Sequence, residues 1–469
     1  MMQDSKLIDL LKALSKKDLA QLGKYFQFHY RKTNNAVVLF NHLADFAPDF
    51  NAEDLDKELA YKQVFKSKSY NDNVMRRTTS KLLEMCEEFI ALNQLQQNEK
   101  AKKLALMRFY NEQGLDKHFK SVYRTWQKDQ QQAGQIDELY FFNQFLVEQE
   151  ISNQIFRQQD RSVEPNLKSI SKELDNFYLM HKLKVCCTSV NYQLLSNTKY
   201  ELSLVSEVLA HIEHNKEQQA PIVMAYYYAL FTLTHPEEEQ YFVQFNKTLF
   251  DNFVQFHPEE RKDLFTLLQN YCIKKINDGN RTYLSRLFQL YKDGLNTAIL
   301  FDENSLSPLD FKNIVTLGVR LSEFEWTEHF IKKYTINLDV SIRASYQDYN
   351  LARLFFGKNE FEKVLELLSK VAHQELFMLL DTKVMQLKCY YELEEFEVMQ
   401  SLLESFRILL LRRKSLGYHK SRYQNFIKYL NKLMRLNLFD KTEKEGLIEE
   451  VVAAPQLLEK DWFLKKLEG

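Results

Sequence analysis

The sequence predicts an all-α protein, and three observations support that prediction. Only 10 of the 469 residues are glycine and 7 are proline, so long stretches run without a helix breaker. Within these stretches the apolar residues recur with the period of an α-helix. In the carboxyl-terminal half one such pattern repeats about every 35 residues, which is typical of stacked helix pairs.

The scarcity of glycine also excludes several kinds of catalytic site. Phosphate-binding loops, nucleophile elbows and dinucleotide fingerprints need closely spaced glycines, because only glycine adopts a positive φ freely and lets the backbone approach a ligand. No two glycines here lie closer together than Gly279 and Gly294, and no HExxH or CxxC motif indicates a metal site. We therefore expect no enzymatic activity, no catalytic residues, no cofactor and no bound metal.

Composition limits the class of protein and its compartment. A chain of 469 residues is too long for one hydrophobic core, so we expect several domains or an extended array. The net charge of −1 means that any site for a polyanion must be local. Five cysteines without a CxxC pair suit reduced thiols and predict a cytoplasmic protein. The longest uncharged run, Gln218–Pro236, predicts a buried helix rather than a membrane span.

The first 97 residues predict a small helical domain. Helical apolar patterns run over Leu7–Tyr30, Val37–Phe46, Glu53–Phe65 and from Asn73 to about Leu95. Short polar loops join them, and no repeat is visible. We therefore expect residues 1–97 to form a domain separate from the array that follows.

The rest of the chain predicts three further segments. Residues 98–300 predict degenerate helical repeats, in which His-Pro-Glu-Glu strings at Pro236 and Pro258 indicate helix starts. Residues 301–436 predict more regular repeats. Residues 437–469 predict an acidic helical segment.

Three Glu-Phe-Glu triplets mark the regular repeats. They begin at Glu323, Glu360 and Glu395, at spacings of 37 and 35 positions. Mostly apolar residues follow each phenylalanine at offsets of three, six, seven and ten, which form one stripe of an α-helix. Each triplet therefore predicts a turn between two helices, with Phe361 and Phe396 buried between antiparallel helices.

One of these units, from Asn350 to about Val371, resembles a tetratricopeptide repeat. The resemblance rests on a small-apolar pair, the aromatics of both helices, a turn residue and two positions facing the first helix: Leu351, Ala352, Phe355, Asn359, Phe361, Val364 and Leu368. Looser units extend it over residues 99–436; two of them contain Leu106, Tyr110, Gly114, Phe119 and Tyr123, and Tyr271, Gly279, Leu284 and Tyr291. The resemblance implies an α-solenoid of antiparallel helix pairs that binds a partner.

The strongest local charge anomaly lies between Ser405 and Phe439, where nine positive residues occur without a single Asp or Glu. The candidate patch for an anionic partner consists of Arg412, Arg413, Lys420, Lys428, Lys432 and Arg435. Clustered Lys and Arg bind polyanions by releasing counterions. Two alternatives stay open: the acidic residues from Asp440 to Asp461 fold back over the stretch, or the charges are simply solvated.

A second basic cluster lies in the amino-terminal domain. A helix, a short polar turn and a second helix that carries Asn73, Arg76, Arg77 and Lys81 near its start have the layout of a helix-turn-helix. Together with the repeats, this layout resembles bacterial transcriptional activators that join a winged helix to a tetratricopeptide-like domain. The resemblance implies that these four residues contact DNA. The alternative is that the domain caps the helical array and that its basic residues are simply solvated.

These observations predict a non-enzymatic interaction scaffold that binds a partner peptide or protein through a helical-repeat surface. The alternative is a DNA-binding transcriptional regulator with a helical-repeat effector domain. Partner, pathway and oligomeric state do not follow from the sequence.

Overall fold

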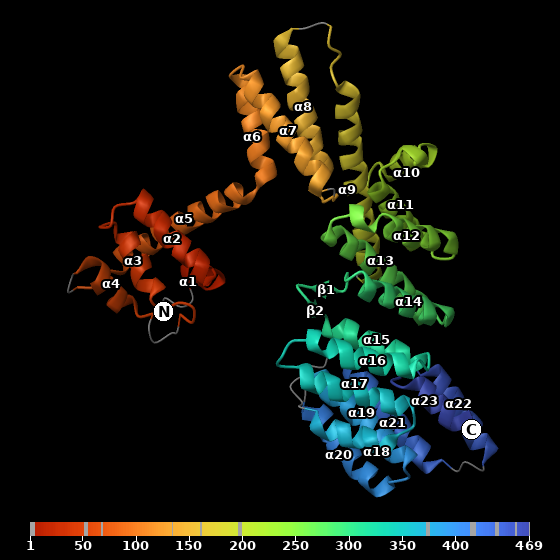
Figure 1. Cartoon of the computed structure of the whole chain (residues 1–469). Helices are drawn as coiled ribbons and strands as arrows, with labels where there is room; N and C mark the ends of the chain where they lie inside the picture. Colours follow the sequence, from red (N-terminus) through yellow and green to blue (C-terminus); the bar gives the residue numbers. More distant parts are fainter. Residues whose placement is uncertain are drawn as a thin grey trace. The chain divides into compact units, whose positions relative to one another are not determined.

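The computed structural model describes residues 5–50, 55–66, 69–133, 135–159, 162–195, 199–371, 376–412, 419–436, 440–454 and 457–468. In this part of the chain the protein is all-α, as predicted, and the regular strands are confined to one short hairpin (Figure 1). Contacts within the chain divide it into two units, Met1–Leu179 and Met180–Gly469. The boundaries of the four segments expected from the sequence are finer than this division and stay predictions.

Unit 1 begins with five helices around one core. They are α1 (Lys6–Ala13), α2 (Lys16–His29), α3 (Asn35–Ala44), α4 (Lys57–Phe65) and α5 (Asp72–Gln97). Leu22 and Phe26 of α2 are fully buried with Phe40 of α3 and Leu82 of α5. The rings of Phe26 and Phe40 meet edge to face with centroids 5.0 Å apart. Burial of these large apolar side chains stabilises the group.

The single helix expected over Leu7–Tyr30 is two helices. The first ends at Ala13, and Leu14 is extended. Ser15 caps the second, because its hydroxyl accepts the backbone N–H of Asp18 at 3.2 Å while the Asp18 carboxylate accepts that of Ser15 at 3.2 Å. This reciprocal pair is a capping box, which starts a new helix inside a continuous apolar pattern.

Unit 1 continues with a second group of helices, α6 (Glu99–Glu112), α7 (Asp116–Ala133), α8 (Tyr140–Gln158) and the first part of α9 (Leu167–Leu195). Helix α6 packs against both α7 and α8. Met107, Phe119, Trp126 and Val147 form a small buried cluster between them.

Unit 2 contains the rest of α9 and helices that pack mainly as consecutive pairs, among them α11 with α12, α13 with α14 and α17 with α18. Figure 1 shows the helices stacked in chain order from α11 to α17. Its first elements are α10 (Val205–His214), η1 (Lys216–Gln218), α11 (Pro221–Thr234), α12 (Glu239–Asp251), η2 (Phe253–Gln255), α13 (Pro258–Asn277) and α14 (Thr282–Asn296).

Two expectations about this part of unit 2 are confirmed and one is wrong. Helix α11 is the buried helix expected within the uncharged run, with ten buried residues along its length. Pro258 occupies the first helical position of α13, where a missing N–H has no consequence. Pro236 does not start a helix, because it lies in a turn and α12 begins at Glu239.

A hairpin of β1 (Phe301–Asp302) and β2 (Ser305–Leu306) separates α14 from the most regular part of unit 2. The following elements are α15 (Pro308–Arg320), α16 (Phe324–Tyr334), η3 (Thr335–Asn337), α17 (Arg343–Gly357), α18 (Phe361–Lys370), α19 (Leu376–Glu392), α20 (Phe396–Arg412), α21 (His419–Arg435), α22 (Lys441–Ala453) and α23 (Lys460–Glu468).

Each Glu-Phe-Glu triplet lies at a helix start, as predicted. Phe324, Phe361 and Phe396 are the first residues of α16, α18 and α20. The predicted burial of the rings is wrong for Phe396, which is 46% exposed, and Phe361 is only half-buried. The first residue of a helix has neighbours of the helix pair on one side only, so its side chain is less covered. Residues one turn later, such as Val364 and Met399, are fully buried.

Candidate functional site

A cavity of about 480 Å³ opens on unit 2, between α15, α17, α19, α21 and the residues before α23. We call it the basic pocket, because five cationic and two acidic side chains line it, an excess of three positive charges. Its charged and hydroxyl-bearing residues are Lys312, Thr316, Arg320, Tyr349, Arg353, Asp381, Lys388, Arg422, Tyr423 and Glu459.

The helical period brings these side chains to one surface. On α15, α17 and α19 the lining residues recur every three or four positions, so each helix presents one face to the cavity. The repeat register then aligns the helices with one another. Thr316, Arg353 and Lys388 each lie seven positions before the first glutamate of a triplet.

Two of the five cations have carboxylate partners inside the pocket. Lys312 of α15 forms an ion pair with Asp381 of α19 at 2.7 Å, and Tyr423 of α21 donates its hydroxyl to the same carboxylate at 2.9 Å. Lys388 of α19 forms an ion pair with Glu459 at 2.7 Å. These bonds connect segments that are distant in the sequence and hold the walls of the cavity together.

The Lys388–Glu459 pair is the most shielded of these contacts. Only 8% of the Lys388 side chain is exposed, and its ammonium lies 4.2 Å from the centroid of the Phe356 ring. Burial alone would raise the pKa of Glu459, but Lys388, Arg353 and Arg320 outweigh it and lower the pKa below its usual value. Glu459 is therefore a carboxylate held in place by surrounding cations.

The other three cations are arginines that have no carboxylate partner among the described residues. Arg320, Arg353 and Arg422 form no ion pair with any residue that the structure describes. Arg353 donates one hydrogen bond, to Thr316 Oγ1 at 2.9 Å, and lies over the Tyr349 ring. Burial opposes its charge, yet the influence of Tyr349, Glu459 and Asp381 prevails and raises the pKa of Arg353.

This arrangement can bind carboxylate or phosphate groups. A guanidinium presents five N–H donors in a planar fork that matches such anions in two-point contacts, and it is always charged. Arg353 uses one of its donors within the protein, so the remaining donors are free for a ligand at the pocket. No group of three or more His, Cys, Asp or Glu side chains in the described residues could hold a metal ion.

The structure also locates the patch predicted for an anionic partner. Arg412, Lys428 and Arg435 are exposed and Lys420 is half-buried on α20 and α21, while Arg413 lies outside the described residues. Lys432 forms an ion pair with Glu450 of α22, so the acidic segment does fold back over part of the stretch. The patch is partly neutralised by the chain itself, and partner binding there stays a prediction.

The residues predicted to contact DNA lie on the first turns of α5. Asn73, Arg76, Arg77 and Lys81 are all exposed. Arg76 pairs with Asp72 at 2.6 Å and Lys81 with Glu84 at 3.0 Å, both along the same helix. Exposed pairs of this kind contribute little to stability and leave the charges accessible. DNA contact stays a prediction.

The basic pocket was not predicted from the sequence, although a signal for it exists. Its unpaired arginines are scattered over about a hundred positions and form no local cluster. The triplet register could have identified Arg353 and Lys388, because equivalent positions of stacked repeats share one surface. Arg422 lies beyond the last triplet and has no such marker.

Comparisons with known proteins identify no relative. No protein-family model matches the chain, and neither a curated protein nor a solved structure shows significant similarity to it. Among the described residues, no helix is both long enough and apolar enough to cross a bilayer.

Proposed function

We propose that this protein is a non-enzymatic interaction scaffold that binds an acidic segment of a partner protein in the basic pocket. The proposal rests on one observation: three arginines without carboxylate partners among the described residues line one cavity. In the same cavity the carboxylate of Glu459 forms an ion pair with Lys388. Glu459 serves as an internal example of the ligand chemistry, since a glutamate side chain is stable beside Lys388. A partner's Asp and Glu side chains would occupy the positions nearest Arg320, Arg353 and Arg422.

Burial and composition support the same proposal. Aromatic and apolar side chains, among them Phe356, Phe377 and Met385, line the cavity beside the arginines, so a peptide would find both apolar and charged contacts. The stacked helices provide a rigid surface on which a segment can bind without reorganising the scaffold. All five cysteines are buried free thiols, which supports a reducing, cytoplasmic compartment as part of the proposal.

The experiment is a fluorescence-anisotropy titration of the full chain with a labelled oligoglutamate peptide. An oligoglutamine peptide of the same length is the uncharged control, and a phosphoserine peptide tests the other anion. We expect saturable binding of the oligoglutamate peptide and none of the oligoglutamine peptide. Arg353→Gln and Arg422→Gln each weaken binding about tenfold or more, because each loses a charge-assisted hydrogen bond.

Lys428→Gln and Arg435→Gln are matched controls, because they remove the same charge from exposed positions of α21. If these controls weaken binding and the pocket variants do not, the ligand binds the α21 patch instead. If the phosphoserine peptide binds more tightly than the oligoglutamate peptide, the ligand of the basic pocket is a phosphorylated segment and not an acidic one. Failure of all three peptides to bind contradicts the proposal.

The exposed start of α5 supports a second candidate function, DNA binding. Arg76, Arg77 and Lys81 lie on accessible turns of one helix in unit 1. A gel-shift titration of the full chain with duplex DNA tests it: binding should fall steeply as salt rises, and Arg76→Ala with Arg77→Ala should weaken it. Absence of binding at low salt removes this candidate.

A further inference from the structure

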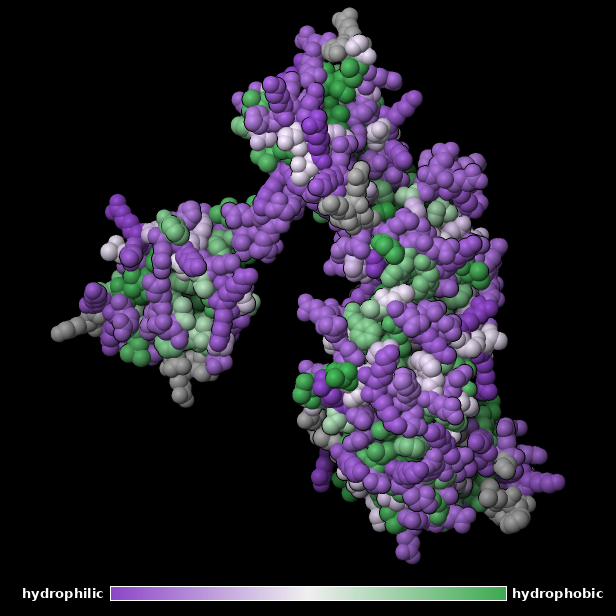
Figure 2. Space-filling view, in the orientation of Figure 1, coloured by the Kyte–Doolittle hydropathy of each residue, from purple (hydrophilic) through white to green (hydrophobic). Residues whose placement is uncertain are grey.

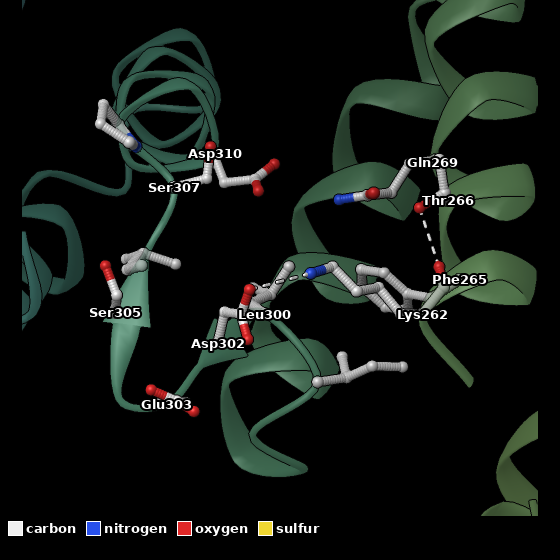
Figure 3. A pocket seen from close by; sticks show the side chains of 13 residues that line it. Lys262, Phe265, Thr266, Gln269, Leu300, Asp302, Glu303, Ser305, Ser307 and Asp310 are labelled. Atoms are coloured by element: carbon white, nitrogen blue, oxygen red, sulfur yellow. Dashed lines mark hydrogen bonds and ion pairs between the residues drawn. The ribbon is translucent and has the colours of Figure 1, made fainter. Parts of the chain in front are cut away.

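A second cavity, of about 610 Å³, lies where α13, the β1–β2 hairpin and the start of α15 meet in unit 2. We call it the hairpin pocket. Its volume falls in the range of small-ligand sites. Figure 3 shows the polar side chains that line it from three elements: Lys262, Thr266 and Gln269 from α13, Asp302 and Glu303 from the hairpin, and Asp310 from α15.

Gln269 is the unusual residue of this pocket. Its side chain is nine-tenths buried, and its amide nitrogen has no hydrogen-bond partner among the described residues. In Figure 3 this nitrogen points into the cavity, toward the side where Asp310 lies. A buried N–H group without a partner is unfavourable by itself, which indicates that a ligand atom completes it.

The charges of the pocket determine what kind of ligand fits. Asp302, Glu303 and Asp310 outnumber Lys262, the single cation of the lining. Lys262 neutralises little, because its ammonium lies 3.8 Å from Asp302 and both side chains are largely exposed. The cavity therefore favours a positively charged group.

Asp310 is the inner carboxylate of the pocket. It accepts a hydrogen bond from the Tyr291 hydroxyl at 3.3 Å, and burial raises its pKa above the usual value, while Tyr291 and Lys262 act in the opposite direction. A cation beside Asp310 would offset the cost of burying this carboxylate. Asp310 and Gln269 thus offer an acceptor and a donor on facing walls of one cavity.

We propose that the hairpin pocket binds a lysine or arginine residue of a peptide, with the side-chain cation at Asp310 and the neighbouring amide carbonyl at the Gln269 nitrogen. The carbonyl is required because the Gln269 amide nitrogen donates and does not accept. A polyamine, which carries cations but no carbonyl, leaves that donor unpaired. This site is separate from the basic pocket and does not depend on the function proposed there.

The test is isothermal titration of the full chain with four probes. Nα-acetylarginine N-methylamide carries both groups; agmatine lacks the amide, and Nα-acetylcitrulline N-methylamide lacks the charge. Free arginine, which adds a carboxylate to a lining that already holds three carboxylates and one lysine, distinguishes a free amino acid from a peptide residue. We expect the arginine amide to bind about tenfold tighter than each of the other three, which corresponds to one hydrogen bond or one ion pair.

Variants assign the two contacts. Gln269→Met should lower the affinity for the arginine amide to that for agmatine and leave agmatine unchanged. Asp310→Asn should weaken both cationic probes, and Gln289→Met, the same change at an exposed glutamine of α14, should weaken neither. The proposal is overturned if no probe binds, if agmatine or free arginine binds as tightly as the arginine amide, or if Gln269→Met changes nothing.

Discussion

At the scale of single residues, the buried amide nitrogen of Gln269 is expected to lower the stability of the folded protein. This nitrogen loses hydrogen bonds to water and gains none among the described residues. We therefore expect Gln269→Met, which keeps the side-chain volume and removes the donor, to raise the free energy of unfolding by about 1 kcal/mol. Urea denaturation of the full chain measures it.

The control for this prediction is Gln289→Met on the surface of α14, which should change the free energy of unfolding by less than about 0.5 kcal/mol. A loss of stability in Gln269→Met would contradict the account of the hairpin pocket. It would mean that Gln269 donates a hydrogen bond within the folded protein, for example to Asp310, and is not free for a ligand.

Glu459 is expected to have the opposite effect on stability. Glu459→Gln leaves the shielded ammonium of Lys388 without its carboxylate. We expect the free energy of unfolding to fall by about 1–3 kcal/mol at neutral pH, because a charged group loses its hydrogen-bond partner. Glu450→Gln, which removes an exposed partner of Lys432, is the control and should cost less than about 1 kcal/mol. Equal losses in the two variants would contradict the structural role of Glu459.

The pH dependence of the same variant follows from the lowered pKa of Glu459. The folded protein holds a proton on this carboxyl less tightly than the unfolded chain does, so the unfolded chain binds more protons in acid. The contribution of Glu459 is therefore complete above the ordinary glutamate pKa and is lost as the pH falls through the lower, folded value. Denaturation midpoints measured between neutral and acid pH should converge for wild type and Glu459→Gln, and parallel curves would contradict this.

At the scale of the element, α20 provides a matched pair of substitutions. Met399 is fully buried, whereas Phe396, three positions earlier, is 46% exposed. Met399→Ala should lower the free energy of unfolding by about 2–5 kcal/mol as a core truncation. Phe396→Ala should lower the free energy of unfolding clearly less, because its ring is partly exposed and packs against the ring of Tyr391 in a T-shaped pair. Thermal denaturation compares them, and a larger loss at Phe396 would contradict the packing of this repeat.

The helices themselves could be predicted from the sequence, whereas the positions at which they begin and end were harder to predict. Scarce glycine and proline and the repeated triplets predicted an all-α chain and three helix starts, which the structure confirms. The break at Ser15 was missed because a capping box interrupts the helix without interrupting the apolar pattern. Burial of Phe396 was predicted wrongly because the stripe defines the face of a helix but not how far its ends extend beyond the neighbours.

The two pockets could not be predicted in the same way, because each combines residues from distant elements. The basic pocket joins α15 to α21, and the hairpin pocket joins α13 to α15 across two short strands that were not predicted from the sequence. Within the described part of the chain, the Gln269 amide nitrogen has no hydrogen-bond partner and Arg353 has no ion pair, and neither fact can be derived from the sequence. Both emerge only when the helices are stacked.

At the scale of the whole molecule, a nearly neutral chain carries local charge excesses of opposite sign. The net charge is −1, and hydrophilic side chains cover most of the visible surface of each unit (Figure 2). On the proposed function, long-range attraction of an acidic partner would therefore come from the basic pocket rather than from the total charge. The affinity for the oligoglutamate peptide should fall as salt rises, and salt-independent binding in anisotropy titrations would contradict an electrostatic site.

The central claim is that the basic pocket binds acidic segments, and the most direct measurement is to locate a bound peptide. An oligoglutamate peptide with a benzophenone group beside its glutamates is photo-crosslinked to the full chain, and the adducts are mapped by mass spectrometry. We predict adducts at residues lining the basic pocket, above all Met385 and Phe377, and their loss in Arg353→Gln. Adducts confined to the exposed face of α21 or to unit 1, unchanged in Arg353→Gln, would contradict the claim.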